Sequence, residues 1–329
     1  MLKLMSSASV AREDSSRAEL RRSVRGKPAD VAPAPPAGPC NALTIDVEDY
    51  FQVEAFAGVI HRHDWEAQPR RVARNTNRLL DIFGEVGVTG TFFMLGWVAQ
   101  RHPDLVRRIV AEGHELASHG SDHYRADQQA REEFRIDVRR SKALLEDIGG
   151  IPILGYRAPT FSVGHRNPWV HATLAEEGYR YSSSVYPIAH DLYGEPDAPR
   201  HPFCPQPGIL EIPLTTIRIF GRNLPTAGGG YFRLLPYRVT RWALREARKD
   251  LRTPCVFYLH PWEIDPDQPR QLHAPRLSRL RHYLNLGRTE GRLHRLLRDF
   301  SWARMDRVFL DGAIPHPPLI EAWLTPRPR

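Results

Sequence analysis

The chain is poor in lysine, in cysteine and in long apolar runs. Of its 46 basic residues only Lys3, Lys27, Lys142 and Lys249 are lysines, so arginine supplies almost all of the positive charge. No run approaches the roughly 18 apolar residues of a membrane span. The N-terminus also lacks the roughly 7–15 apolar residues of a secretory signal. We therefore expect a soluble, cytoplasmic protein.

The cysteines and the charge exclude two further classes. Cys40, Cys204 and Cys255 are odd in number and lack the spacing of a metal knuckle, which argues against a disulfide scaffold and suits a reducing compartment. The formal charge is +8, but the arginines are interleaved with acidic residues. A nucleic-acid-binding protein gathers its basic residues on one face. We expect no nucleic-acid partner.

What the sequence does contain is an alternation of strand-like and helix-like segments after a tail, residues 1–40, that ends in a proline-rich linker. Apolar runs predict buried strands near residues 43–47, 89–96, 114–120, 153–159, 181–185, 209–215 and 254–260. Helical spacing and end signals predict helices near residues 71–83, 102–113, 128–148, 167–178 and 236–249. This alternation favours a parallel α/β sheet or barrel.

The segment from Arg276 to Arg298 is helical, basic and amphipathic, and lies beyond the last predicted strand. We expect it to pack as an appendage with a solvated face. Peripheral contact with an anionic membrane surface is the alternative interpretation of the same pattern.

Polar side chains follow four of the predicted strands, where parallel α/β proteins place their sites. Asp46, Glu48 and Asp49 repel one another unless a cation lies among them. His119 and His123 are four residues apart, so a helical turn would put both rings on one face. Two histidines with a carboxylate from either Glu48 or Asp49 are typical of a catalytic zinc.

The remaining polar residues suggest acid–base chemistry. Asp46 would take a proton from the metal-bound water, and Arg157 would hold Asp46 ionised through a bidentate bond. His260 would protonate a leaving group. Trp262 and Tyr156 beside these positions suit sugar rings. Each residue also has an ordinary interpretation as a solvated turn, a backbone-bonded histidine or a core aromatic.

Taken in order, these motifs resemble one known family. The segments around Asp46, His119-Gly-Ser-Asp-His123, Tyr156-Arg157-Ala-Pro159, Tyr181 and His260-Pro-Trp262-Glu263 resemble the polysaccharide deacetylases, the NodB-homology proteins of carbohydrate esterase family 4. DVEDYF, HPWEIDPDQPR and RHYLNLGRTEGRL resemble the subgroup encoded with exosortase-linked (PEP-CTERM) exopolysaccharide clusters.

The resemblance implies a distorted (β/α)₇ barrel over residues 41–270, with residues 271–329 as a C-terminal helical extension packed on it. It implies metal-dependent removal of N-acetyl groups from amino sugars of an exopolysaccharide or its lipid-linked precursor. Zinc is the expected metal, with cobalt, nickel or manganese as alternatives. By this resemblance Asp46 would be the catalytic base and Arg157 would orient it. His119 and His123 would bind the metal, and His260 would be the catalytic acid.

Further roles follow from the same resemblance. The backbone N–H near Tyr181 would hold the oxyanion, and the substrate-binding residues would be Tyr156, Pro159, Tyr181 and Trp262. Two departures stand out. Val47 follows Asp46 where the family has a second aspartate, so the metal carboxylate moves to Glu48 or Asp49. Ser182 stands where an aspartate that tunes the acid histidine is expected, which leaves Asp265 or Asp191 as substitutes and makes lowered activity an alternative.

Three rival functions fit parts of this pattern. A catalytically weak carbohydrate-binding scaffold is favoured by Ser182 and by the basic C-terminal helix. A cyclic-amide hydrolase of the same fold would act on a small molecule, although the GGGYF loop, residues 228–232, suits an open sugar groove better. Nucleic-acid binding rests only on arginine content. The sequence leaves the oligomeric state open.

Overall fold

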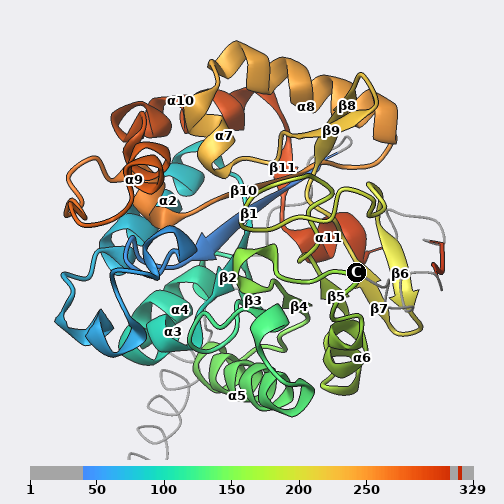
Figure 1. Ribbon diagram of the computed structural model, residues 1–329, viewed down its shortest axis with the longest axis horizontal. Coiled ribbons are helices and arrows are strands. Elements are labelled where there is room, and N and C mark those ends of the chain that lie inside the picture. Colours follow the sequence, from blue (N-terminus) through green and yellow to red (C-terminus); the bar gives the residue numbers. More distant parts are fainter. Residues whose placement is uncertain (1–39, 312–317, 321–329) are drawn as a thin grey trace, which may run out of the picture. The chain divides into compact units, whose positions relative to one another are not determined.

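Strands and helices alternate along the chain, and Figure 1 shows the helices placed around the strands. The computed structural model describes residues 40–311 and 318–320, so nearly all of the expected tail lies outside the described residues. The strands are β1 (Asn41–Val47), β2 (Thr91–Met94), β3 (Glu115–Ser118), β4 (Gly155–Tyr156), β5 (Tyr181–Ser182), β6 (Phe203–Gln206), β7 (Ile209–Glu211), β8 (Thr216–Ile219), β9 (Arg222–Pro225), β10 (Val256–Leu259) and β11 (Trp302–Ala303).

The helices fall between these strands and after β10. The α-helices are α2 (Val72–Val86), α3 (Gly96–Arg101), α4 (Pro103–Ala111), α5 (Arg131–Gly149), α6 (Trp169–Glu176), α7 (Gly229–Leu234), α8 (Tyr237–Leu251), α9 (Arg276–Tyr283), α10 (Leu286–Asp299) and α11 (Met305–Phe309). Short 3₁₀ helices are η1 (Glu54–Phe56), η2 (Arg62–Ala67), η3 (Ala126–Gln128), η4 (Pro159–Phe161) and η5 (Pro261–Ile264).

Seven strands form a parallel sheet in the order β10-β1-β2-β3-β4-β5-β7, which confirms the predicted parallel α/β fold. β6 adds to β7 in the antiparallel direction, β11 pairs with β1, and β8 with β9 forms a separate hairpin. Residues 183–202, between β5 and the β6–β7 pair, contain no helix. The repeating strand–helix pattern is therefore irregular on this side of the sheet.

The central position of β1 follows from its composition. All seven residues of NALTIDV are buried, as expected for a strand that has parallel neighbours on both edges and helices over its faces. Helices α2 and α5 both end at a glycine with positive φ, Gly87 at 72° and Gly150 at 67°. Glycine carries no Cβ, so it takes this left-handed conformation without steric cost.

Most of the predicted strands are shorter than expected, and β4 keeps only Gly155–Tyr156 of the predicted residues 153–159. β5 ends at Ser182 rather than residue 185, and β7 ends at Glu211 rather than residue 215. The reason is that backbone groups beyond β5 bind side chains instead of a neighbouring strand. The N–H groups of Ser184 and Val185 donate to Glu211 Oε1, at 2.8 and 2.9 Å.

The segment after Arg276 also differs from expectation. It forms two helices, α9 and α10, because Asn285 between them adopts a left-handed conformation with φ of 55°. The strand near residue 256 is not the last one, since β11 returns to the sheet beside β1. In the part of the chain that the structure describes, no helix is both long and apolar enough to cross a membrane.

Candidate active site

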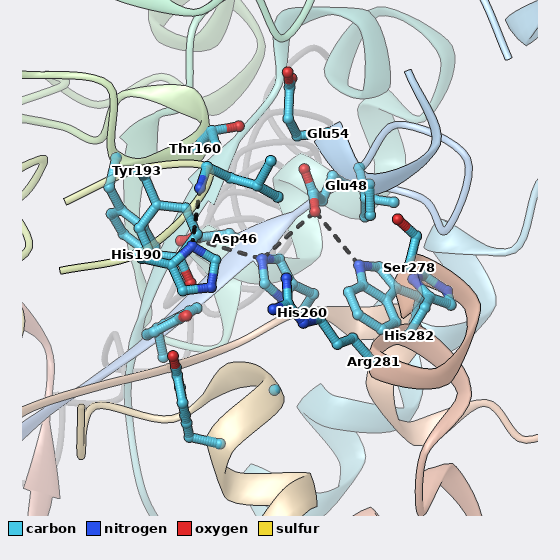
Figure 2. A pocket seen from close by; sticks show the side chains of 18 of the residues that line it. Asp46, Glu48, Glu54, Thr160, His190, Tyr193, His260, Ser278, Arg281 and His282 are labelled. Carbon is cyan, nitrogen blue, oxygen red and sulfur yellow. Dashed lines mark hydrogen bonds and ion pairs between the residues drawn. The ribbon is translucent and has the colours of Figure 1, made fainter. Parts of the chain in front are cut away.

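A pocket of about 460 Å³ opens where β1, β3, β4 and β10 end. Asp46 and Glu48 reach it from β1, His119 and His123 from the loop after β3, and His260 from the end of β10. Figure 2 shows His260 between Asp46 and Glu48, with its Nε2 4.0 Å from Asp46 Oδ2 and 3.5 Å from Glu48 Oε1. The structure therefore brings together the charged groups that the sequence places at separate strand ends.

Glu48, His119 and His123 form a group with the donor set of a metal site. One ligand atom from each lies within 4.8 Å of the other two, and all three residues are buried. Glu48 Oε2 lies 2.7 Å from His123 Nε2 without hydrogen-bond geometry, so it is a buried oxygen without a hydrogen-bond donor. Two imidazoles and a carboxylate suit a divalent cation such as zinc.

The two histidines do not lie on a helix, and the expectation of a helical turn is wrong. Residues 119–123 form an irregular loop in which Gly120 and His123 both have positive φ, 77° and 56°. His119 Nδ1 lies 2.8 Å from the Arg157 carbonyl oxygen, which leaves its Nε2 for a ligand. Burial, and then His123, lowers the pKa of His119 to about 3, so the ring is neutral at pH 7 as a metal ligand must be.

Asp49, the other candidate carboxylate, lies outside this group. Its Oδ2 accepts hydrogen bonds from the N–H groups of Arg71 and Val72, at 2.6 and 2.9 Å, and its Oδ1 accepts from Tyr50 at 2.9 Å. Burial raises its pKa to about 6, although these three N–H groups oppose the rise. Asp49 therefore satisfies the first N–H groups of α2.

Asp46 is held by Arg157, but not by the bidentate bond that we expected. Arg157 Nη1 donates to Asp46 Oδ1 at 2.6 Å and to Thr44 Oγ1 at 2.8 Å. The other two bonds of its guanidinium go to Ser183, to the carbonyl oxygen at 3.0 Å and to Oγ at 3.1 Å. Arg157 is fully buried, so its position is set on every side, and Asp46 Oδ2 remains free to face the pocket.

His260 has a carboxylate partner that we did not predict. Glu263 Oε1 lies 2.8 Å from His260 Nδ1, and Glu263 Oε2 accepts a hydrogen bond from Arg233 Nε at 2.6 Å. Burial alone would lower the pKa of His260, but the nearby Glu48 and Glu263 raise it to about 9. Burial would raise the pKa of Glu263, whereas Arg233 and His260 lower it to about 2.

Neither substitute proposed for the missing aspartate pairs with His260, whose ion pairs are with Asp46, Glu48 and Glu263. Asp265 forms ion pairs with Arg71 and Arg74, both at 3.0 Å, and Asp191 pairs with Arg281. Both assignments are wrong, because the carboxylate comes from the short η5 helix that follows His260 itself. The signal in the sequence was the three-residue spacing of His260 and Glu263, which one turn of helix brings together.

Of the four predicted substrate-binding residues, only Trp262 lines the pocket. Tyr181 is fully buried, its hydroxyl donates to Glu115 at 3.0 Å and its N–H to the Leu154 carbonyl at 3.2 Å. The N–H of Tyr181 itself is therefore already bonded, and the oxyanion role expected of a backbone N–H near Tyr181 stays a prediction. Tyr156 and Pro159 are buried outside the pocket lining.

The sequence analysis did not predict that Arg233 and His282 line the pocket. His282 stacks on Trp262 at 4.1 Å, and Trp262 stacks on His260 at 5.1 Å. Arg233 Nη1 donates to the carbonyl oxygens of residues 281, 282 and 284 and so joins α7 to α9. No spacing in the sequence links residues 233, 263 and 282.

Comparisons with known proteins divide the chain between residues 182 and 183. Residues 64–182 match the family model for polysaccharide deacetylase, and residues 183–310 match a domain of unknown function, DUF3473. The second model crosses residue 270, where we expected the catalytic domain to end, and the domain division stays a prediction.

Two curated relatives match parts of the chain. A peptidoglycan-N-acetylglucosamine deacetylase from Bacillus cereus is 33% identical over 105 residues, which cover 32% of this chain and 47% of the relative. A chitooligosaccharide deacetylase from Rhizobium leguminosarum bv. trifolii is 50% identical over 48 residues, 15% of this chain and 22% of the relative. The chain thus spans about half, or less, of the length of the curated relatives it matches.

One solved structure supports the fold. A Mycobacterium smegmatis protein named as a polysaccharide deacetylase has a TM-score of 0.55 and 20% identity, over 91% of this chain and 98% of that chain. The predicted fold, of the kind seen in these deacetylases, is confirmed.

Proposed function

We propose that the protein is a metal-dependent hydrolase that removes N-acetyl groups from amino sugars, which the match of residues 64–182 to the polysaccharide deacetylase model supports. The substrate we propose is an exopolysaccharide or its precursor. The observation that carries the proposal is one pocket holding a metal-type donor set, an arginine-bound carboxylate and a carboxylate-bound histidine.

The donor set fits a divalent cation, with Glu48, His119 and His123 as its protein ligands. When bound, the cation supplies Lewis-acid polarisation of a carbonyl and lowers the pKa of a water molecule. His119 is neutral and buried, and its Nδ1 is taken by the Arg157 carbonyl oxygen, so the ring already has the tautomer and orientation of a ligand.

Asp46 is the residue we propose as general base. Its Oδ1 is bound by Arg157, so Oδ2 takes the proton from the attacking water as the water oxygen adds to the acetamide carbon. The Arg157 guanidinium, fully buried, prevents Asp46 from turning away from the pocket. Arg157 acts through Asp46 and is a positioning residue.

His260 is the residue we propose as general acid. Glu263 accepts a hydrogen bond at Nδ1, so the proton on Nε2 points toward Asp46 and Glu48. As the C–N bond breaks, His260 Nε2 gives this proton to the leaving sugar amine and acetate is released. With Glu263 in place, the scaffold interpretation loses the argument that rested on Ser182.

The test is acetate release from N-acetylglucosamine oligomers by the full chain, loaded with zinc or cobalt or treated with chelator. We expect release only with metal, and a fall of about 10²–10⁴-fold in Asp46→Asn with one metal still bound per chain. His119→Ala should lose both metal and release. His63→Ala and Asp104→Asn, whose side chains are 79% and 97% exposed, are the matched controls.

Metal bound at one per chain without acetate release from any oligomer or from the host's own polymer would contradict the deacetylase. That result would favour the scaffold or a cyclic-amide substrate.

A further inference from the structure

The pocket has two chemically different walls. One wall carries the carboxylates and imidazoles of the candidate active site. The other carries Tyr193 and Tyr231 together with five leucines of the β5–β7 connection, α7, α9 and the residue after α9: Leu192, Leu234, Leu277, Leu280 and Leu284. Leu277 and Leu280 are 55% and 61% exposed. Leucine offers a sugar neither a hydrogen bond nor an aromatic face, so amino-sugar binding does not explain the leucines.

The apolar surface continues beyond the pocket along one segment. Leu272, just before α9, is 65% exposed. The leucines of α10 behave differently, because Leu293 and Leu296 are fully buried in the core. Leu272, Leu277 and Leu280 thus give three exposed leucines to residues 270–281, which we call the α9 rim. Apolar side chains exposed together in this way mark an interaction surface.

The α9 rim is also strongly cationic. Between residues 268 and 289 the chain has no aspartate or glutamate and five arginines, of which Arg288 lies on α10 and the other four lie in the α9 rim (Arg270, Arg276, Arg279 and Arg281). Among the described residues of this stretch, the ion pair is that of Arg281 with Asp191, at 2.8 Å. Arg270 and Arg279 instead border a second hollow together with Leu272 and Leu280. Positive charge and exposed leucine thus share one surface.

We propose that the α9 rim binds the surface of an anionic lipid bilayer. Leucines enter the boundary between headgroups and acyl chains, while arginines contact lipid phosphates, which is the pattern of interfacial protein segments. Because the same leucines line the pocket, binding places its mouth at the membrane. If the proposed function holds, on which this step rests, membrane binding narrows the substrate to amino sugars carried at a membrane. Figure 2 shows Ser278 and Arg281 of α9 at this pocket.

Other occupants fit the α9 rim less well. A second copy of the chain would bring arginines against arginines, which opposes association. An uncharged polysaccharide would leave both the arginines and the leucines without complementary partners. An anionic bilayer offers phosphates and acyl chains in one surface.

The test is sedimentation of the full chain with vesicles of phosphatidylcholine, with and without added phosphatidylglycerol. We expect binding to the anionic vesicles, weakened by salt, and at least about a tenfold loss in Leu272→Ser/Arg276→Gln. Both substituted residues lie outside the catalytic pocket lining. The matched control is Ile136→Ser/Arg140→Gln on α5, where Ile136 is 59% exposed. It should leave vesicle binding and acetate release unchanged.

Three results would overturn the proposal. The first is the absence of binding to anionic vesicles by a folded wild-type chain, and the second is an equal loss in the control. The third is a wild-type dimer in light scattering that dissociates in Leu272→Ser/Arg276→Gln, which would assign the α9 rim to a second copy. Vesicle binding without acetate release from any oligomer or from the host's own polymer would contradict only the proposed function. Release without vesicle binding would contradict only the lipid proposal.

Discussion

His119 comes from the region that matches a polysaccharide deacetylase, and His260 from the region of unknown function. Both line the same pocket, yet their pKa values move in opposite directions, to about 3 and about 9. Burial lowers the pKa of both rings. His119 then faces His123, whereas His260 faces Glu48 and Glu263, whose negative charges reverse the effect of burial. One region therefore holds a neutral imidazole and the other a protonated one, which are the states that the proposed metal ligand and the proposed acid require.

The side chains of the pocket are also held by different means. Asp46 and Glu48, which precede the region that matches the deacetylase model, lie at the end of β1, and His119 lies directly after β3, so the parallel sheet itself places them. His260 follows β10, but its orientation depends on Glu263 and, through Glu263, on Arg233 from α7. Backbone pairing in the sheet fixes the first group, whereas the orientation of His260 depends on side-chain contacts with Glu263 and Arg233. The predictions below test this difference.

The largest effect is expected at Arg233. Arg233→Met would leave Glu263 as a buried carboxylate without its guanidinium, so the free energy of unfolding should fall by about 3–5 kcal/mol. Denaturant unfolding measures this loss. Arg107→Met, which breaks an ion pair between exposed side chains, should change stability by about 1 kcal/mol or less.

A double variant separates stability from function. Arg233→Met/Glu263→Leu should recover much of the stability, because no unpaired charge is then buried. Acetate release should stay low, since His260 would still lack its carboxylate. A double variant as unstable as Arg233→Met alone would contradict the role of charge and point to packing.

The next effect concerns the metal side. Glu48→Gln should weaken zinc binding by more than about 100-fold, because even an outer partner of a ligand contributes about 10–100-fold. Titration against a competing chelator measures the affinity. An unchanged affinity would place the metal carboxylate elsewhere and remove Glu48 from the site.

A smaller effect is expected at Glu263. Glu263→Gln should lower kcat for acetate release by about 10–100-fold, because His260 loses the charge that keeps it protonated and the acceptor that orients it. The alkaline fall of activity should move to lower pH. Metal stoichiometry should stay at one per chain, which distinguishes this variant from Glu48→Gln.

His260 and Glu263 also make the stability of the metal-free protein depend on pH. The pKa of His260 in the folded chain, about 9, lies above its ordinary value of 6.5. The resulting stabilisation is therefore fully present below pH 6.5 and is lost as the pH rises through about 9. Glu263→Gln should flatten this loss in thermal unfolding. An identical slope in the variant would mean that Glu263 does not stabilise protonated His260.

The smallest effect is expected at Asp49. Asp49→Asn should reduce stability by about 1 kcal/mol, because one acceptor of the first N–H groups of α2 is weakened. Zinc stoichiometry and affinity should not change. A loss of zinc binding in this variant would reverse the assignment between Asp49 and Glu48.

Much of this architecture could be read from local pattern. Runs such as Leu43–Val47 and residues 254–260 are apolar over strand length, and the helices carry regular apolar spacing with glycine or proline at their ends. These signals come from residues that are close together in the chain, so they can be recognised from the sequence alone. Shorter elements were less predictable, because β5 and β7 end where Glu211 binds backbone N–H groups from another segment.

The candidate site divides in the same way. The sequence by itself determined which strand ends carry Asp46, His119 and His260, because parallel strands bring their carboxyl ends to one edge. Only the tertiary structure favours Glu48 over Asp49 as the proposed metal ligand, since that choice depends on whether a helix 22 residues later uses the carboxylate.

The tertiary structure alone also joined Arg233 to Glu263, buried Tyr181 and separated the exposed leucines of α9 from the buried ones of α10. Each of these outcomes is a contact between segments that are distant in the chain or a choice of which face to bury. Residue spacing encodes periodicity and turns, whereas such contacts depend on which surfaces meet when the sheet and its helices pack.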